Sequence, residues 1–109
     1  MTTLTTDGTD LAMALKALAD PTRLRLLRLV AQQERCVCEL YGALGLAQNL
    51  VSHHLRVLRE AGLVSARRDA RWAHYSLCTE RLDDLLGLVA VWIAEGADVG
   101  GGACEVDGE

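Results

Sequence analysis

The chain has no phenylalanine and a single proline, and two tryptophans with two tyrosines are its only large aromatic residues. Leucine, alanine and valine must therefore supply most of the core, a composition typical of small helical domains. No run of about 18 uncharged apolar residues occurs, so we expect no membrane-spanning helix. The N-terminus also lacks the basic and apolar regions of a secretory signal. These absences favour a cytoplasmic protein whose four cysteines are reduced thiols.

Further absences argue against an enzyme. The sequence has no Cys-x-x-Cys motif, no alternation of strands with helices and no cofactor-binding loop, which a thiol oxidoreductase would need. We therefore expect no catalytic residues. A dimeric interaction module that binds no DNA is another alternative, and it leaves the polar helix face described below unexplained.

Charge is distributed unevenly along the chain, whose net charge is −4. Residues 47–77 carry five arginines and two acidic residues, a net charge of +3. The net charge of residues 78–109 is −7, and that of residues 1–46 is zero. A nucleic acid responds to the local field rather than to the total charge. The basic middle segment therefore permits a DNA partner despite the acidic total.

The spacing of apolar residues predicts one domain, residues 9–95, between a disordered tail at 1–8 and a flexible, Gly-rich acidic tail at 96–109. Asp20 and Pro21 are typical of a helix start, and Gly45 of a helix end. The expected elements are helices at 9–19, from 21, at 37–44, at 48–61 and from 79, with a hairpin of 63–68 and 71–77 around a 69–70 turn. This order predicts a mainly α fold with a small β-hairpin, a winged helix-turn-helix.

The helix at 48–61 has two faces. Val51, Leu55 and Leu58 recur at core spacing, and His54 lies near them, so it is expected to pack inside. The opposite face carries groups that can bond to base edges in the major groove: Gln48, Asn49, Ser52, His53 and Arg56. An ordinary solvated helix face is the alternative interpretation.

The hairpin that follows favours DNA binding over that alternative. Arg67, Arg68 and Arg71 flank its turn, where they can contact phosphates or enter a minor groove. A charged turn is usually only solvated, but this one adjoins the polar helix face. The arginines of the second helix are instead expected to be solvated: Arg23, Arg25 and Arg28.

Three segments of the chain resemble the ArsR/SmtB family of metal-responsive repressors: ADPTRLRLL at 19–27, SHHLRVLREAGLV at 52–64 and YSL at 75–77. The resemblance implies a homodimer, assembled through the first and last helices, that binds an inverted-repeat operator on double-stranded DNA. Two residues depart from the family pattern. Ala47 stands where serine is common, so the fourth helix lacks a side-chain cap. Ala70 stands where glycine is common, so the hairpin turn is expected to differ.

Two thiols lie at the start of the third helix, in the motif Cys36-Val37-Cys38-Glu39-Leu40. They lie about 200° apart on an ideal helix, so they can face one ion only at the start of a helix, where the pattern puts them. In metal-responsive relatives this motif marks the sensing site, and the resemblance implies a repressor of the arsenic-sensing type. Such a protein releases its operator when arsenite or antimonite binds to thiolates. Trivalent arsenic prefers three sulfur ligands.

The third ligand is not evident, because Tyr41 stands where some arsenic-sensing relatives have a third cysteine. Cys104, in the Gly-rich tail, is the preferred candidate, Cys78 is the second, and two-thiol ligation is the other alternative. Cys78 is expected to be a buried structural residue. The family's competing site for zinc or similar ions uses aspartate and histidine ligands on the last helix, and residues 80–95 contain no histidine. Rival inducers are Cd²⁺, Pb²⁺ and an oxidant that forms a disulfide such as Cys38–Cys104.

Overall fold

Local sequence determines where the helices of the computed structural model begin and end. Asp20 Oδ1 accepts hydrogen bonds from the N–H groups of Thr22 at 2.8 Å and Arg23 at 3.1 Å. Pro21 occupies the first position of the second helix, where its missing N–H has no intrahelical partner to lose. The third helix ends at Gly45, whose φ of 67° lies in the left-handed region that glycine tolerates.

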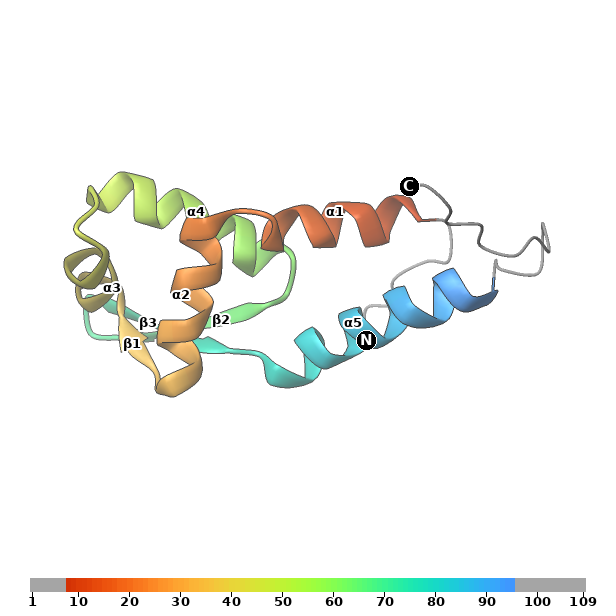
Figure 1. Cartoon of the computed structure of the whole chain (residues 1–109). Coiled ribbons are helices and arrows are strands. Elements are labelled where there is room, and N and C mark those ends of the chain that lie inside the picture. Colours follow the sequence, from red (N-terminus) through yellow and green to blue (C-terminus); the bar gives the residue numbers. More distant parts are fainter. Residues whose placement is uncertain (1–7, 96–109) are drawn as a thin grey trace.

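The structure describes residues 8–95, and within them the predicted winged helix-turn-helix is confirmed (Figure 1). Both tails, apart from Gly8, and with them Cys104, lie outside the described residues. The elements in chain order are α1 (Thr9–Leu18), α2 (Pro21–Gln32), β1 (Arg35–Cys36), α3 (Val37–Leu44), α4 (Gln48–Glu60), β2 (Val64–Asp69), β3 (Trp72–Leu77) and α5 (Thr79–Glu95).

A three-stranded antiparallel sheet takes the place of the simple hairpin that the sequence predicts. Its strand order is β1-β3-β2, so the two-residue strand β1 adds to the free edge of the hairpin. The hairpin turn is Ala70-Arg71, one residue later than expected. Strand β1 was not predicted, because two residues are too short for any periodic pattern.

The core forms where α2, α3, α4 and the sheet meet. Its completely buried side chains are mostly leucines, as the composition predicts: Leu26, Leu40, Val51, Leu55, Leu58 and Leu63. Helices α1 and α5 lie side by side at the other end of an elongated molecule (Figure 1). Only part of each of these two helices is buried, through residues such as Leu11 and Leu85.

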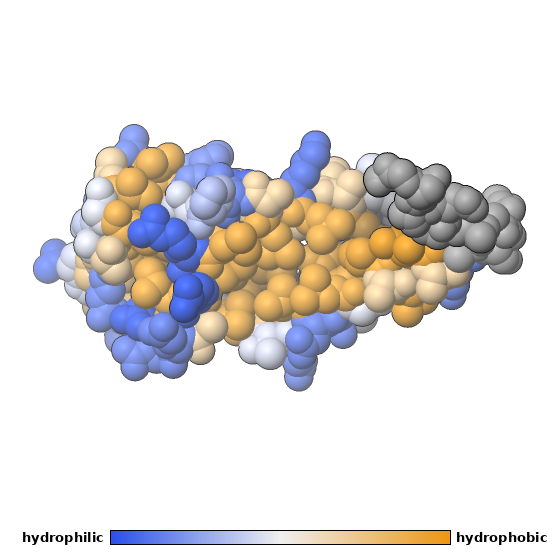
Figure 2. All heavy atoms as spheres, in the orientation of Figure 1, coloured by the Kyte–Doolittle hydropathy of each residue, from blue (hydrophilic) through white to orange (hydrophobic). Residues whose placement is uncertain are grey.

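Helices α1 and α5 expose an unusual amount of apolar surface. Figure 2 shows apolar side chains gathered across the half of the molecule that these helices form. The large exposed residues there are Met13, Leu86, Leu88, Val91, Trp92 and Ile93. Between residues 8 and 95, no helix is long and apolar enough to cross a membrane.

Candidate nucleic-acid interface and thiol site

The outward face of α4 brings together the five residues that the sequence selects there. Val51, Leu55 and Leu58 are buried on one side of this helix, so the polar side chains must face solvent. They line a shallow hollow of about 550 Å³: Gln48, Asn49, Ser52, His53 and Arg56. Ala47, before the helix, makes no side-chain cap, as expected.

His54 is buried, as predicted, and its partner is Arg23. The two side chains meet at 3.2 Å, between Arg23 Nη1 and His54 Nδ1. Arg23 Nε also donates to the carbonyl oxygen of Ala17 at 2.8 Å, near the end of α1. The expectation of a solvated Arg23 is therefore wrong, because its guanidinium joins α1 to the core side of α4.

The wing is the hairpin of β2 and β3. All three of its predicted arginines are exposed, and two of them, Arg68 and Arg71, lie at its tip. Arg68 Nη1 donates to the carbonyl oxygen of Arg71 at 3.4 Å. The Arg71 guanidinium lies 5.9 Å from the centre of the Trp72 ring. Ala70, in the turn between them, has a φ of 60°. The predicted departure at this turn is thus an alanine in a conformation that glycine adopts more readily.

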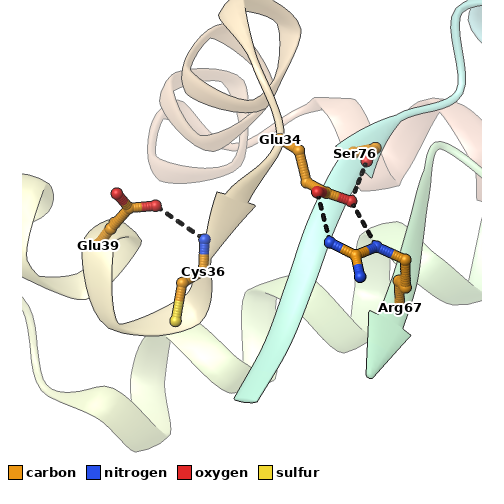
Figure 3. Close-up of polar contacts among 5 residues, drawn as sticks. All are labelled: Glu34, Cys36, Glu39, Arg67 and Ser76. Atoms are coloured by element: carbon orange, nitrogen blue, oxygen red, sulfur yellow. Dashed lines mark hydrogen bonds and ion pairs between the residues drawn. The ribbon is translucent and has the colours of Figure 1, made fainter. Parts of the chain in front are cut away.

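The third arginine of the wing, Arg67, is held by a carboxylate. Arg67 Nη2 donates to Glu34 Oε1 at 2.8 Å and Arg67 Nε donates to Glu34 Oε2 at 3.1 Å (Figure 3). The hydroxyl of Ser76 donates to the same Oε2 at 3.3 Å. The hydrogen bond from Arg67 holds the pKa of Glu34 below its ordinary value. Arg67 is therefore less available to a phosphate than Arg68 or Arg71.

The two thiols of the motif lie at the first turn of α3. Cys36 is buried and caps this helix, its Sγ accepting the Cys38 N–H at 3.4 Å while Glu39 Oε1 accepts the Cys36 N–H at 2.9 Å. The two sulfur atoms are 2.8 Å apart. Their hydrogen bond raises the pKa of the Cys38 thiol. The expectation that both thiols face one point is consistent with this geometry.

No third ligand joins this pair within the described residues. His74 lies opposite Cys36 across the β1–β3 pairing. Cys78 follows four residues later, roughly 13 Å along the strand direction, and is half-buried rather than buried as expected. Across residues 8–95, no three His, Cys, Asp or Glu side chains gather closely enough to hold a metal ion. The structure thus places Cys36 with Cys38 but does not bring Cys78 to them.

Comparison with known proteins shows the family to which this chain belongs. Residues 20–66 match the profile described as "Bacterial regulatory protein, arsR family". The structure is similar to the crystal structure of NolR from Sinorhizobium fredii, with 34% identity, a TM-score of 0.67, and coverage of 83% of this chain and 94% of that one. The chain belongs to the ArsR family.

Two curated members of the ArsR family show how far this similarity extends. A "Transcriptional repressor SmtB homolog" of Synechocystis sp. is 44% identical over 79% of this chain and 65% of its own length. The "Arsenical resistance operon repressor" of Escherichia coli is 46% identical over 57% of this chain and 54% of its own. The chain thus spans about half to two thirds of these relatives.

Proposed function

We propose that this ArsR-family chain is a DNA-binding transcriptional repressor that acts as a homodimer and releases its operator when arsenite binds to Cys36 and Cys38. One observation supports this most: the two sulfur atoms lie 2.8 Å apart at the start of α3. The end of that helix, Gly45, is separated by two residues from the start of α4, whose exposed face is polar. Ligand binding and DNA binding are thereby assigned to the two helices of one helix-turn-helix.

DNA recognition is assigned to α4 and the wing. The amides of Gln48 and Asn49 and the guanidinium of Arg56 suit base edges in a major groove. Arg68 and Arg71, exposed at the wing tip, suit phosphates or a narrow minor groove. Arg67 contributes to the interface mainly through its ion pair with Glu34, the residue before β1.

The apolar surface of α1 and α5 is assigned to the dimer contact. Side chains such as Met13, 65% exposed, and Ile93, 61% exposed, cost free energy in water and are expected to pack against a second copy. A two-fold dimer places two α4 helices on successive major grooves of an inverted repeat. Because α1 and α5 lie at one end of the elongated molecule, a dimer formed there would leave the exposed face of α4 and the wing available to DNA (Figure 1).

The chemistry of the thiol pair suits trivalent arsenic. Each thiol that binds replaces one hydroxyl of As(OH)₃: an As–S bond forms, an As–O bond breaks, and the thiol proton leaves with the hydroxide as water. The oxidation state does not change. Cys104 is the proposed third ligand, and where no third thiol binds, one hydroxyl stays on the arsenic. The similarity to the arsenical resistance operon repressor of Escherichia coli supports an arsenical inducer.

Release requires only modest coupling between the two sites. A coupling free energy of about 1–3 kcal/mol changes operator affinity roughly 5–150-fold. Movement of the first turn of α3 reaches α4 through Gly45, Leu46 and Ala47. A small displacement of either recognition helix is sufficient, since both must fit successive grooves at once.

Operator gel shifts with arsenite, antimonite, Cd²⁺, Pb²⁺, Zn²⁺ and an oxidant test the proposal. Cys36→Ser and Cys38→Ser are expected to bind operator normally and to lose release by arsenite. Serine is a suitable replacement at position 36, because its hydroxyl can still cap α3 while the sulfur is removed. Cys104→Ser is expected to weaken release and Cys78→Ser to leave it unchanged. Normal release from Cys36→Ser or Cys38→Ser would refute the thiol site.

The DNA interface is tested separately. Arg56→Ala is expected to weaken operator binding by about 1–3 kcal/mol. Arg71→Ala is expected to reduce the slope of log affinity against log salt by about 0.9, the contribution of one phosphate contact. Arg25→Ala is the matched control, since Arg25 is exposed on α2, outside α4 and the wing. Equal effects of all three substitutions would contradict the assignment.

A further inference from the structure

The strand that carries the first thiol is part of the wing sheet. Strand β1 pairs with β3, so that Arg35 faces Tyr75 and Cys36 faces His74. β3 in turn pairs with β2 along the whole hairpin, as far as the Asp69–Trp72 pair next to the turn. Because hydrogen-bonded strands move together, a displacement of Cys36 is passed to the wing as well as to α3.

Glu34 strengthens this connection. It directly precedes β1, on the far side of β3 from β2, yet its carboxylate accepts hydrogen bonds from Arg67 of β2 and Ser76 of β3 (Figure 3). The side chain of Glu34 thus connects the start of β1 with both β2 and β3. Glu34 lies two residues before Cys36. The side chains of the ion pair are 55% and 38% exposed, and such pairs contribute little to stability. Its effect is therefore on the orientation of the strands.

Ligation changes the local geometry from which Glu34 extends. In the described conformation, Cys36 Sγ accepts the N–H of Cys38 at 3.4 Å and shares a hydrogen bond with Cys38 Sγ. When both thiols bind arsenic they lose their protons, so the hydrogen bond between the two sulfurs is lost and each sulfur is oriented by its As–S bond instead. The backbone at the end of β1 must adjust, and Glu34 lies on the same stretch of chain.

We propose that Glu34 is a positioning residue that transmits ligand binding at Cys36 and Cys38 to the wing, through Arg67 and Ser76. This route acts beside the one through Gly45 to α4, and it rests on the proposed function. It makes a specific claim: arsenite changes the wing itself, and the Glu34–Arg67 ion pair is required for part of that change.

A tryptophan in the wing allows the claim to be measured. Trp72 is 45% exposed next to the wing tip, and the described chain has one other tryptophan, Trp92 of α5. In the Trp92→Phe variant, all tryptophan fluorescence comes from Trp72. Arsenite is expected to shift this emission. The arsenite concentration at half of that shift is expected to equal the concentration at half of operator release, which is measured by fluorescence anisotropy of labelled DNA. Trp72→Phe, which leaves Trp92, is the reciprocal control.

Glu34→Gln in the Trp92→Phe background is the decisive variant. It keeps the side-chain length and removes the charge that binds Arg67. We expect arsenite to bind Cys36 and Cys38 with unchanged stoichiometry, the Trp72 shift to be largely lost, and operator release to fall at least threefold. Affinity without arsenite is expected to stay within about fivefold, as for loss of an exposed ion pair. Glu80→Gln, the same charge change at the exposed start of α5, is expected to behave as its parent.

A double-mutant cycle links the effect to the ion pair. Arg67→Gln combined with Glu34→Gln is expected to reduce the response to arsenite no further than Glu34→Gln alone. An unchanged Trp72 shift in Glu34→Gln, or additive losses in the cycle, would overturn the inference. Arsenite-dependent release without any Trp72 shift would overturn it while leaving the proposed function intact. If arsenite failed to release the wild-type protein, the proposed function would fall first, and this inference with it.

Discussion

Replacement of Ala70 by glycine is expected to stabilise the protein. Ala70 has a φ of 60° in the turn of the wing. An L-residue with a side chain costs about 1–2 kcal/mol in this left-handed conformation, because Cβ approaches the following carbonyl oxygen. Glycine avoids that cost but loses roughly 0.5–1 kcal/mol of additional conformational entropy on folding. The balance favours Ala70→Gly by about 0.5–1 kcal/mol.

Thermal unfolding followed by circular dichroism measures this effect. For a domain of this size, the gain corresponds to a rise in Tm of about 2–8 °C. Protein concentration must be held fixed, because the proposed dimerisation would make Tm depend on it. Ala73→Gly is the matched control, since Ala73 lies inside strand β3, where glycine is expected to destabilise by about 0.5–1 kcal/mol. A Tm of Ala70→Gly at or below that of the wild type would refute the reasoning.

Three further predictions follow from single contacts. Gly62→Ala is expected to lower Tm, because φ is 79° there and an added Cβ would lie 2.7 Å from Arg81 Nε; an unchanged Tm would contradict the described packing. Hydrogen bonds from the N–H groups of Arg23 and Thr22 lower the pKa of Asp20 from 3.8, so its stabilisation is complete above the unfolded pKa and is lost as the pH falls through the folded one. The free energy of unfolding, measured in urea between about pH 2 and pH 7, should then fall less steeply toward low pH for Asp20→Asn than for wild type. An identical pH dependence would show that Asp20 does not contribute to acid unfolding. Because the Cys36 hydrogen bond raises the pKa of Cys38, Cys36→Ala should accelerate iodoacetamide alkylation of Cys38 at mildly alkaline pH, as quantified by mass spectrometry; an equal or slower rate would show that the bond has no such effect.

Much of the candidate site could be predicted from local patterns. The apolar stripe of Val51, Leu55 and Leu58 determines the buried side of α4, and the polar stripe follows as its complement. Asp20 and Gly45 mark helix ends through contacts within a few residues. The thiols of Cys36 and Cys38 are separated by one residue, so their proximity at a helix start required no knowledge of the fold.

Other parts of the site depend on partners that are distant in the chain. Arg23 looked solvated because its partner, His54, is 31 residues away. Arg67 looked available to DNA because Glu34, which binds it, is 33 residues away. Neither pair leaves a periodic pattern, because a charge on an exposed position is compatible with solvent, with DNA or with an ion pair.

Local patterns predict the order of the helices and the hairpin, the helix ends, the polar face of α4 and the two thiols ahead of it, because each depends on residues within about two helical turns of one another. The pairing of β1 with the wing, the ion pair of Glu34 with Arg67 and the separation of Cys78 from Cys36 instead follow from the packing of the whole domain. The contacts of Glu34 with Arg67 and Ser76 connect segments more than 30 residues apart. Their formation depends on how the helices and the sheet pack around one core, which no local spacing encodes.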